Sequence, residues 1–349
     1  MRAADFADRV VRWQAAHGRN DLPWSGTRDP YRVWLSEIML QQTQVATVLD
    51  YYPRFLARFP DVRALARAPL SEVLGLWSGL GYYARARNLH RCAQELVERQ
   101  GGTFPRSALE LAKLPGIGRS TAAAIAAFCS GERVAILDAN VRRVLTRVLG
   151  FGADLAVIAH ERQLWEQAEE LLPTADLARA MPRYTQGLMD LGATVCLAGN
   201  PDCAHCPLAD VCVAYRQGRV RDYPVRTRKL QRRSENWWLL LCVDDAGRCW
   251  LAQRPARGIW GGLQCPPVFA SRRALDAALP HGAAQVREWP AFTHVLTHRD
   301  LLLHPMLVRT AQAPADVPGA WHAAGAWRSL GLPAPVRKWL EAVDSAGRG

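Results

Sequence analysis

Apolar residues follow one periodicity through the first two thirds of the chain and another after about residue 236. In the first part they recur at intervals of three and four, as on the buried face of a helix. After Asp138, for example, this spacing is kept by Val141, Val144, Leu145 and Val148. The pattern predicts helices over residues 1–16, 31–58, 71–79, 108–113, 119–130 and 156–195.

The last third of the chain has a pattern that indicates strands. Residues 237–254 predict two strands joined by an Asp-Ala-Gly turn, and residues 292–310 predict further strands. Helices are expected near residues 272–279 and 334–343. We therefore expect a multidomain protein with a mainly α-helical region over 1–215, a linker over 216–235 and an α+β domain over 236–345.

The composition allows a sizeable core and points to a polyanionic partner. The hydrophobic fraction is 49%, and no run of eighteen apolar residues predicts a membrane span. The N-terminus has early aspartates and no apolar core, so it predicts an amphipathic helix rather than a targeting peptide. The net charge is +12, and half of it lies in residues 216–236. Such a stretch is typical of a solvated linker and equally of a segment that contacts phosphates.

Four of the nine cysteines lie close together. Cys196, Cys203, Cys206 and Cys212 have the spacing Cys-x6-Cys-x2-Cys-x5-Cys. An odd count without a leader is typical of a reducing compartment, where clustered thiols bind metal. Four thiolates hold either zinc or a [4Fe–4S] cluster, and the spacing alone does not decide between them.

Two carboxylates are candidates for acid–base chemistry. Glu37 is followed by the apolar run Ile38, Met39 and Leu40, which would desolvate it, raise its pKa and favour a general acid. The alternative is a solvated glutamate on an amphipathic helix. Asp138 stands where a helix begins, so it is expected to cap that helix, and the helix N-terminus favours its ionised form.

Two glycine-rich turns are candidates for DNA contact. Residues 114–118 place two glycines between helices, which exposes backbone amides to a phosphate without reading sequence. Gly79 and Gly81 precede Tyr82, and several arginines follow, an arrangement that suits insertion of an aromatic ring into a base stack. Packing of the tyrosine in the core is the alternative.

Several motifs together resemble a known family. The chain resembles the helix-hairpin-helix DNA glycosylases with an iron–sulfur cluster in the segments GIGRSTAAAI and LDANVRRVL and in its four-cysteine spacing. A closer resemblance, to the adenine DNA glycosylases of the MutY type, rests on SEIMLQQTQV, WSGLGYYARARNL, MDLGATVC and LAQRPARGIWGGL. It extends from about residue 21 to residue 339.

The resemblance implies excision of adenine mispaired with 8-oxoguanine, or more weakly with guanine, from double-stranded DNA. Glu37 would protonate N7 of the adenine and then help to activate water, while Asp138 would stabilise the oxocarbenium-like sugar. A six-helix barrel-type module would hold this site, and the four clustered cysteines would hold a [4Fe–4S] cluster. The implied enzyme is a monomer in a bacterial-type cytoplasm, associated with the nucleoid and not with a membrane.

The resemblance also implies binding residues. Arg19, Trp24 and Gln186 would line the pocket for the flipped adenine. DNA contacts would come from Gln42, Tyr82, Gly116, Gly118 and Ser120. Related enzymes that also cut the strand have a lysine where this chain has Ser120, so we expect base excision without efficient strand cleavage.

The C-terminal domain resembles the Nudix fold. The Nudix hydrolase motif needs a Glu-rich helix to hold magnesium, and the segment after Gly262 has no such array, so diphosphate hydrolysis is not expected. The family uses this domain to read 8-oxoguanine through a Phe-Ser-His loop. This chain has Phe292, Thr293 and His294 there, and threonine keeps the hydroxyl but adds a methyl. Two alternatives remain: an endonuclease III-like glycosylase and lyase acting on oxidised pyrimidines, and a non-catalytic iron–sulfur protein that binds DNA.

Overall fold

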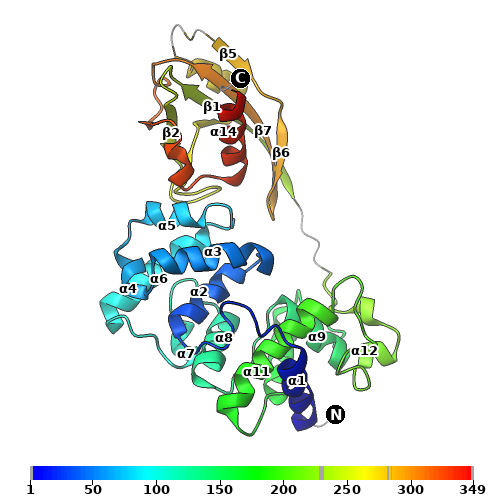
Figure 1. The fold of residues 1–349 in the computed structure, drawn as a ribbon. Helices are drawn as coiled ribbons and strands as arrows, with labels where there is room; N and C mark the ends of the chain where they lie inside the picture. The colour runs from blue at the N-terminus through cyan, green and yellow to red at the C-terminus, as the bar shows by residue number, and fades with distance from the viewer. Residues whose placement is uncertain (1–2, 228–231, 281–282, 284, 347–349) are drawn as a thin grey trace. The chain divides into compact units, whose positions relative to one another are not determined.

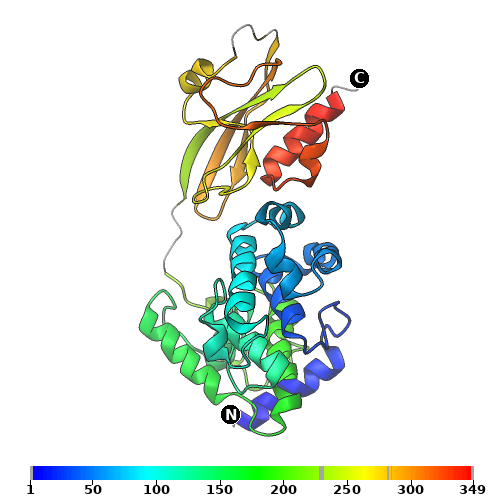
Figure 2. The same ribbon diagram turned by 90° about the vertical axis from the view of Figure 1, so that its left-hand side faces the viewer.

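The computed structural model describes residues 3–227, 232–280, 283 and 285–346, and the chain divides into two compact units. The first unit comprises Met1–Ala66 and Arg91–Lys229, and the second comprises Arg67–His90 and Leu230–Gly349. Residues 228–231 of the expected linker lie outside the described residues. Helices build the first unit, whereas a β-sheet with helices builds most of the second (Figures 1 and 2).

The helices that precede residue 230 alternate with short loops. They are α1 (Ala3–His17), α2 (Pro30–Leu40), α3 (Val45–Arg58), α4 (Val62–Arg67), α5 (Leu70–Trp77), α6 (Ala84–Gln100), α7 (Ala108–Leu111), α8 (Arg119–Ser130), α9 (Ala139–Leu149), α10 (Ile158–Glu170), α11 (Leu177–Asp190) and α12 (Val213–Arg216). A π-helical turn, Leu191–Val195, continues α11, and a 3-10 turn, Val220–Asp222, follows α12. None of the helices in the described ranges is long and apolar enough to cross a bilayer.

The alanine-rich helix α8 is central to the packing of the first unit. It buries six consecutive residues, from Ala122 to Ala127. Small side chains let helix axes approach closely, and α8 packs against α2, α7 and α11. Helix α1 packs along α11, as both views show (Figures 1 and 2). One apolar core joins α1, α8, α9, α10 and α11, and α2, which carries Glu37, packs against α8 and α3.

Two helices that the pattern predicts as continuous are interrupted. The segment 31–58 forms α2 and α3, and the chain between them turns where Gln42 has a φ of +57°. The segment 156–195 forms α10 and α11, because the ring of Pro173 cannot continue a helix. The other helices expected before residue 156 begin and end within a few residues of the prediction.

The part of the second unit that follows the linker contains a mixed sheet of eight strands. The strands are β1 (Arg233–Val243), β2 (Cys249–Gln253), β3 (Gln264–Cys265), β4 (Val268–Phe269), β5 (Gln285–Glu288), β6 (Phe292–Val295), β7 (Arg299–Arg309) and β8 (Ala320–His322). β1 and β7 pair in parallel, and every other pair is antiparallel. Helix α13 (Arg272–Ala277) packs on β1 and β4, and α14 (Ala334–Ala346) comes last. The α+β expectation for this part is confirmed.

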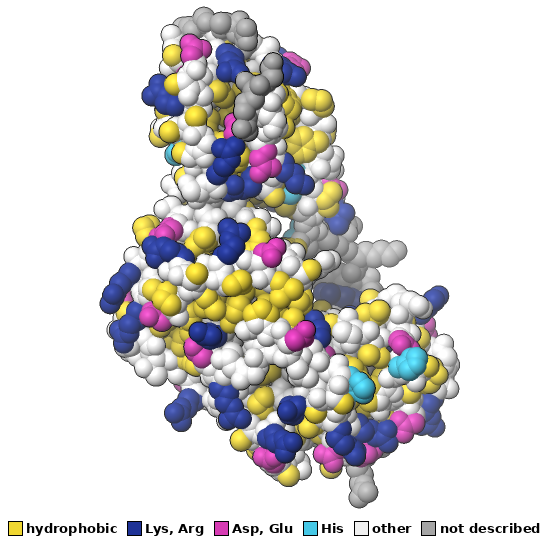
Figure 3. Space-filling view, viewed as in Figure 1, with side chains coloured by type: hydrophobic (Ala, Val, Ile, Leu, Met, Phe, Trp, Pro, Cys, Tyr) yellow, Lys and Arg dark blue, Asp and Glu magenta, His cyan; other side chains and the backbone are white. Residues whose placement is uncertain are grey.

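The basic side chains are spread over the surface. On the face in Figure 3, Lys and Arg are interleaved with acidic side chains on both units and do not gather into one patch. The net charge of +12 therefore acts on this face as a diffuse field. On this face, a tight contact with a polyanion would come from backbone amides and individual side chains.

Candidate active site and cysteine site

Helix α2 carries Glu37 into the interior of the first unit. Asp29 caps this helix by accepting a hydrogen bond from the Tyr31 amide at 2.9 Å, and Pro30 fits its first turn. Seven of its eleven residues are buried, so the helix is anchored on most sides. Glu37 lies on the remaining side, where it lines a cavity.

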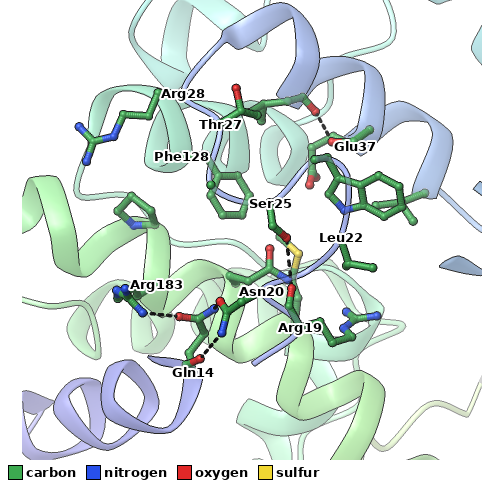
Figure 4. A pocket seen from close by; sticks show the side chains of 18 of the residues that line it. Gln14, Arg19, Asn20, Leu22, Ser25, Thr27, Arg28, Glu37, Phe128 and Arg183 are labelled. Carbon is green, nitrogen blue, oxygen red and sulfur yellow. Dashed lines mark hydrogen bonds between the residues drawn. The ribbon is translucent and has the colours of Figure 1, made fainter. Parts of the chain in front are cut away.

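The cavity beside Glu37 has a volume of about 330 Å³. Helix α2, the loop after α1, the Phe128 ring of α8 and one face of α11 form its walls. Figure 4 shows Glu37 across the cavity from a hydrogen-bonded group in which Arg183 donates to Gln14 at 3.2 Å and Gln14 donates to Asn20 at 2.7 Å. The volume suits a molecule of the size of one nucleobase.

The surroundings of Glu37 favour its protonated form. Burial raises the pKa of Glu37 to about 8, and the negative charge of Asp138 acts in the same direction. A carboxylic acid with this pKa holds its proton at neutral pH and can donate it. The Glu37 side chain faces an interior cavity, which argues against the alternative of a solvated glutamate on a helix surface.

Asp138 caps α9, as the sequence predicts. Its Oδ1 accepts a hydrogen bond from the Val141 amide at 2.7 Å. Burial raises the pKa of Asp138, whereas the amides of Val141 and Asn140 and the charges of Arg143 and Arg142 lower it. Asp138 does not line the cavity, and it acts on Glu37 through its negative charge, which raises the pKa of Glu37. Among the described residues, amides donate to Asp138 but not to the Glu37 carboxyl group, so Glu37 is the one expected to keep the proton.

The three residues expected to hold adenine lie together in this cavity. Arg19, Trp24 and Gln186 all line it. The Trp24 ring packs edge to face against Tyr52, with ring centroids 5.4 Å apart. The structure thus brings these three residues together with Glu37, although they are separated by up to 167 positions in the chain.

The hairpin between α7 and α8 has the backbone that its glycines allow. Gly116 has a φ of +76°, and Gly118 stands at the N-cap of α8, where a Cβ would meet no atom within 4 Å. Ser120, in the first turn of α8, accepts a hydrogen bond from the Leu137 amide at 3.1 Å. Ser120 is therefore tied to the residue that precedes Asp138.

Gln42 and Tyr82 share an unusual backbone conformation. Both belong to the five described non-glycine residues with positive φ, with values of +57° and +48°. Gln42 is exposed, and 47% of Tyr82 is exposed. Left-handed backbone at a non-glycine residue is costly and is often found at functional positions. An exposed tyrosine also argues against its being a core residue.

The four clustered cysteines line one small cavity after the π-helical turn. The Arg147 guanidinium, which is buried, donates to Cys196 Sγ at 3.3 Å and to the Leu197 carbonyl at 2.7 Å. In the described residues, no group of His, Cys, Asp and Glu is arranged to hold a single metal ion. A tetrahedral zinc site would bring its sulfur atoms within about 3.8 Å of one another, whereas the four thiolates of a cluster stand around it. Four cysteines around one cavity are a donor set that fits either a zinc ion or a [4Fe–4S] cluster.

Thr293 and His294 lie on β6 in the second unit. Thr293 pairs with Leu302 of β7. Thr293 and His294 line a cavity of about 430 Å³ together with Lys338. Burial lowers the pKa of His294, and the charge of Lys338 acts in the same direction. The imidazole is therefore neutral at pH 7 and can both donate and accept a hydrogen bond.

Two stretches of the chain match known protein families. Residues 35–170 match the HhH-GPD superfamily of base excision DNA repair proteins, and residues 237–342 match the NUDIX domain. The chain is 34% identical over 348 residues to the adenine DNA glycosylase of Buchnera aphidicola subsp. Baizongia pistaciae, across 97% of this chain and 96% of that protein. The chain belongs to the adenine DNA glycosylase family.

A mammalian relative and solved structures agree with this membership. The adenine DNA glycosylase of Mus musculus is 44% identical over 221 residues, which cover 61% of this chain and 42% of the mouse protein. A thermostable thymine-DNA glycosylase superposes with a TM-score of 0.53 at 30% identity, over 61% of this chain and 95% of that one. A complex of endonuclease III with DNA gives a TM-score of 0.50 at 23% identity, over 61% and 94% of the two chains, and shares the helical fold.

One further residue of this adenine DNA glycosylase, not among those predicted from the sequence, lies next to the cavity. Asp190, at the end of α11, is fully buried and accepts hydrogen bonds from Arg19 and Gln186. Its position four residues after Gln186 is a signal, because residues four apart share a helix face. Its partnership with Arg19 has no such signal.

Proposed function

We propose that the protein removes adenine mispaired with 8-oxoguanine, or with guanine, from double-stranded DNA by hydrolysing the N-glycosidic bond. The observation that carries this proposal is the placement of Glu37, an acid with a pKa of about 8, in the cavity that also holds Arg19, Trp24 and Gln186. A base must leave the duplex to enter such a cavity, at a cost of a few kcal/mol. The protein acts as a monomer on chromosomal DNA, and we place it in the cytoplasm with the nucleoid.

The two carboxyl groups divide the chemistry. Glu37 donates its proton to N7 of adenine, so that the base can take the electron pair of the C1′–N9 bond as it leaves. The sugar becomes positively charged, and the ionised Asp138 stabilises it, because the amides at the start of α9 keep its charge accessible. Glu37, now a carboxylate, accepts a proton from the water that adds to C1′. The products are adenine and an abasic site, and Glu37 is again protonated.

Ser120 limits the reaction to base removal. Strand cleavage by a lyase needs an amine that forms a Schiff base with the sugar. Ser120 supplies a hydroxyl that is already bonded to the Leu137 amide, so it serves to position the chain before Asp138. The abasic product is therefore released uncut.

Backbone amides and two side chains that insert into the duplex hold the DNA. The amides near Gly116 and Gly118 bind a phosphate, a contact that fixes the position of the duplex without reading its sequence. Gln42 and Tyr82 enter the duplex where the adenine has left, and their exposure supports this role. Thr293 and His294 of the Nudix-like unit read the 8-oxoguanine, because their hydroxyl and neutral imidazole offer donors to its extra oxygen.

We further propose that Cys196, Cys203, Cys206 and Cys212 hold a [4Fe–4S] cluster. Such a cluster would cross-link the loop that follows α11. The Arg147 guanidinium supports the negative charge of the Cys196 thiolate. Broad visible absorption with four irons per chain is the expected result, and a colourless, zinc-loaded protein would contradict it.

The test of the function is a single-turnover excision assay with enzyme in excess over a duplex that holds one adenine opposite 8-oxoguanine. We expect excision by the natural protein, loss of excision with binding retained in Glu37→Gln, and no change in Glu98→Gln, an exposed control on α6. Normal excision by Glu37→Gln would remove Glu37 from the mechanism. Binding without excision by the natural protein would favour the non-catalytic alternative.

A further inference from the structure

Asp190 occupies a position that the proposed mechanism does not use. None of its surface is exposed, and it lies behind Arg19 and Gln186, which line the cavity that holds Glu37. Its Oδ2 accepts a hydrogen bond from the Arg19 amide at 3.0 Å. Its Oδ1 accepts two more, from Arg19 Nε at 2.7 Å and from Gln186 Nε2 at 2.8 Å. A fully buried carboxylate thus holds two residues that line the cavity.

The carboxylate determines which end of the Gln186 amide faces the cavity. A side-chain amide has a donating NH₂ group and an accepting oxygen, and either end can point in a given direction. A carboxylate only accepts, so the NH₂ group of Gln186 must face Asp190. The Gln186 oxygen has no other protein partner in the described chain and remains available to the cavity.

Arg19 is fixed in the same way. Its backbone amide and Nε are both used by Asp190, which leaves its two terminal nitrogens as donors. Because 28% of the Arg19 side chain is exposed, its terminal donors can be reached by a ligand. The wall formed by these two residues therefore offers one acceptor and two donors.

This pattern complements adenine. Adenine carries an amino donor at position 6 between two ring nitrogens that accept, N1 and N7. Hypoxanthine has the same ring system, but position 6 is a carbonyl acceptor and N1 is a donor. With Asp190 in place, the Gln186 oxygen would face the carbonyl of hypoxanthine without a proton between them.

We propose that Asp190 is a positioning residue that makes the cavity selective for a purine with an amino group at position 6, by fixing the orientation of Gln186 and Arg19. The inference rests on the proposed adenine excision and adds the origin of its base specificity. Asp190 does not touch the base. It acts through the two side chains that do.

The variant that tests this is Asp190→Asn. An asparagine of the same shape can keep its oxygen at the Oδ2 position for the Arg19 amide, and its NH₂ group then takes the Oδ1 position, where it faces both Gln186 and Arg19 Nε. The Gln186 amide then turns, so that its oxygen accepts from the new donor and its own NH₂ group faces the cavity. That orientation suits the carbonyl of hypoxanthine, and the preference for adenine is reduced.

The experiment compares single-turnover rates and half-saturating enzyme concentrations on two duplexes, with adenine or hypoxanthine opposite 8-oxoguanine. For each protein the rate on adenine is divided by the rate on hypoxanthine. Comparing this ratio between the variant and the natural protein cancels the different intrinsic labilities of the two bases. We expect the preference for adenine to fall by about tenfold or more in Asp190→Asn, the effect of one reversed hydrogen bond. Asp190→Asn added to Gln186→Met should reduce the preference no further, because the two residues act together.

Asp244 provides a matched control. It is buried in the second unit and accepts hydrogen bonds from the amide and Nε of one arginine, Arg248, at 2.7 and 2.6 Å, as Asp190 does from Arg19. Asp244→Asn should lower the melting temperature and leave the adenine preference unchanged. An unchanged preference in a folded Asp190→Asn protein would overturn the inference.

Two further outcomes separate the inference from the function on which it rests. If Asp190→Asn does not fold, Gln186→Met carries the test, and full retention of the adenine preference by that variant would overturn the inference. If the natural protein excises neither base, the proposed function fails first. Excision of adenine by the natural protein together with an unchanged preference in the variants would contradict the role of Asp190 alone.

Discussion

The protonation of Glu37 predicts how adenine excision depends on pH. With a pKa of about 8, about nine tenths of Glu37 is protonated at pH 7 and about one tenth at pH 9. The protonated form is the active one, so the rate of base removal should be retained below pH 8 and should fall about tenfold between pH 7 and pH 9. Asp138 must be ionised and its pKa is also raised, so the rate should fall again on the acid side.

The assay is single-turnover excision from an adenine:8-oxoguanine duplex at saturating enzyme, with alkaline cleavage of the abasic product and with DNA binding measured at each pH. Asp138→Asn should lower the pH at which the alkaline limb begins, because the charge of Asp138 contributes to the raised pKa of Glu37. Because the two carboxyl groups interact, the apparent pKa values of the acid and alkaline limbs of the pH–rate profile belong to the pair and not to either residue alone. An excision rate that rises through pH 8 and pH 9 would refute the assignment of Glu37 as the acid.

Four other predictions follow from features of single residues. Because its pKa is raised, Glu37 destabilises the folded state as pH rises from about 4.5 to about 8. In urea titrations, the free energy of unfolding of Glu37→Gln should exceed that of the natural protein by up to about 5 kcal/mol above pH 8 and should equal it near pH 4. A difference that does not change with pH would contradict this. Gly116→Ala strains a φ of +76° by about 1–2 kcal/mol and should weaken binding to an abasic-analogue duplex in anisotropy titrations, whereas Gly152→Ala should not. Thr293→Ala should reduce the preference for 8-oxoguanine over guanine opposite adenine several-fold, and an unchanged ratio would argue against β6 as the reader. Because of Ser120, borohydride should trap no stable protein–DNA adduct, and efficient trapping would disprove base removal alone.

The parts of the fold that depend on local chemistry could be predicted from the sequence. Asp138 begins α9 because an aspartate before an apolar stripe caps a helix, and the structure has this cap. The turn between β1 and β2 follows from Asp-Ala-Gly in the same way. Pro173 also indicates a break between α10 and α11, although the apolar pattern alone predicts one helix over residues 156–195.

Other features depend on contacts between distant residues. No glycine or proline marks the end of α2, and the turn at Gln42 accompanies a hydrogen bond from Gln41 to Thr121 of α8, 80 positions away. Asp190 reads as an ordinary polar residue until Arg19, 171 positions before it, is placed beside it. The identity of the acid could be predicted from an apolar neighbourhood, whereas the cavity that makes it an acid could not.

The π-helical turn after α11 ties two sites to one length of chain. It begins directly after Asp190, and the Cys196 amide closes it with a hydrogen bond to the Leu191 carbonyl at 2.6 Å. Such a turn holds one more residue than an α-helical turn. Deleting a residue there would turn the chain that follows by about 100° about the helix axis relative to Asp190, so that Asp190 and the four-cysteine site could not both keep their present positions. This segment should therefore tolerate no insertion or deletion during evolution.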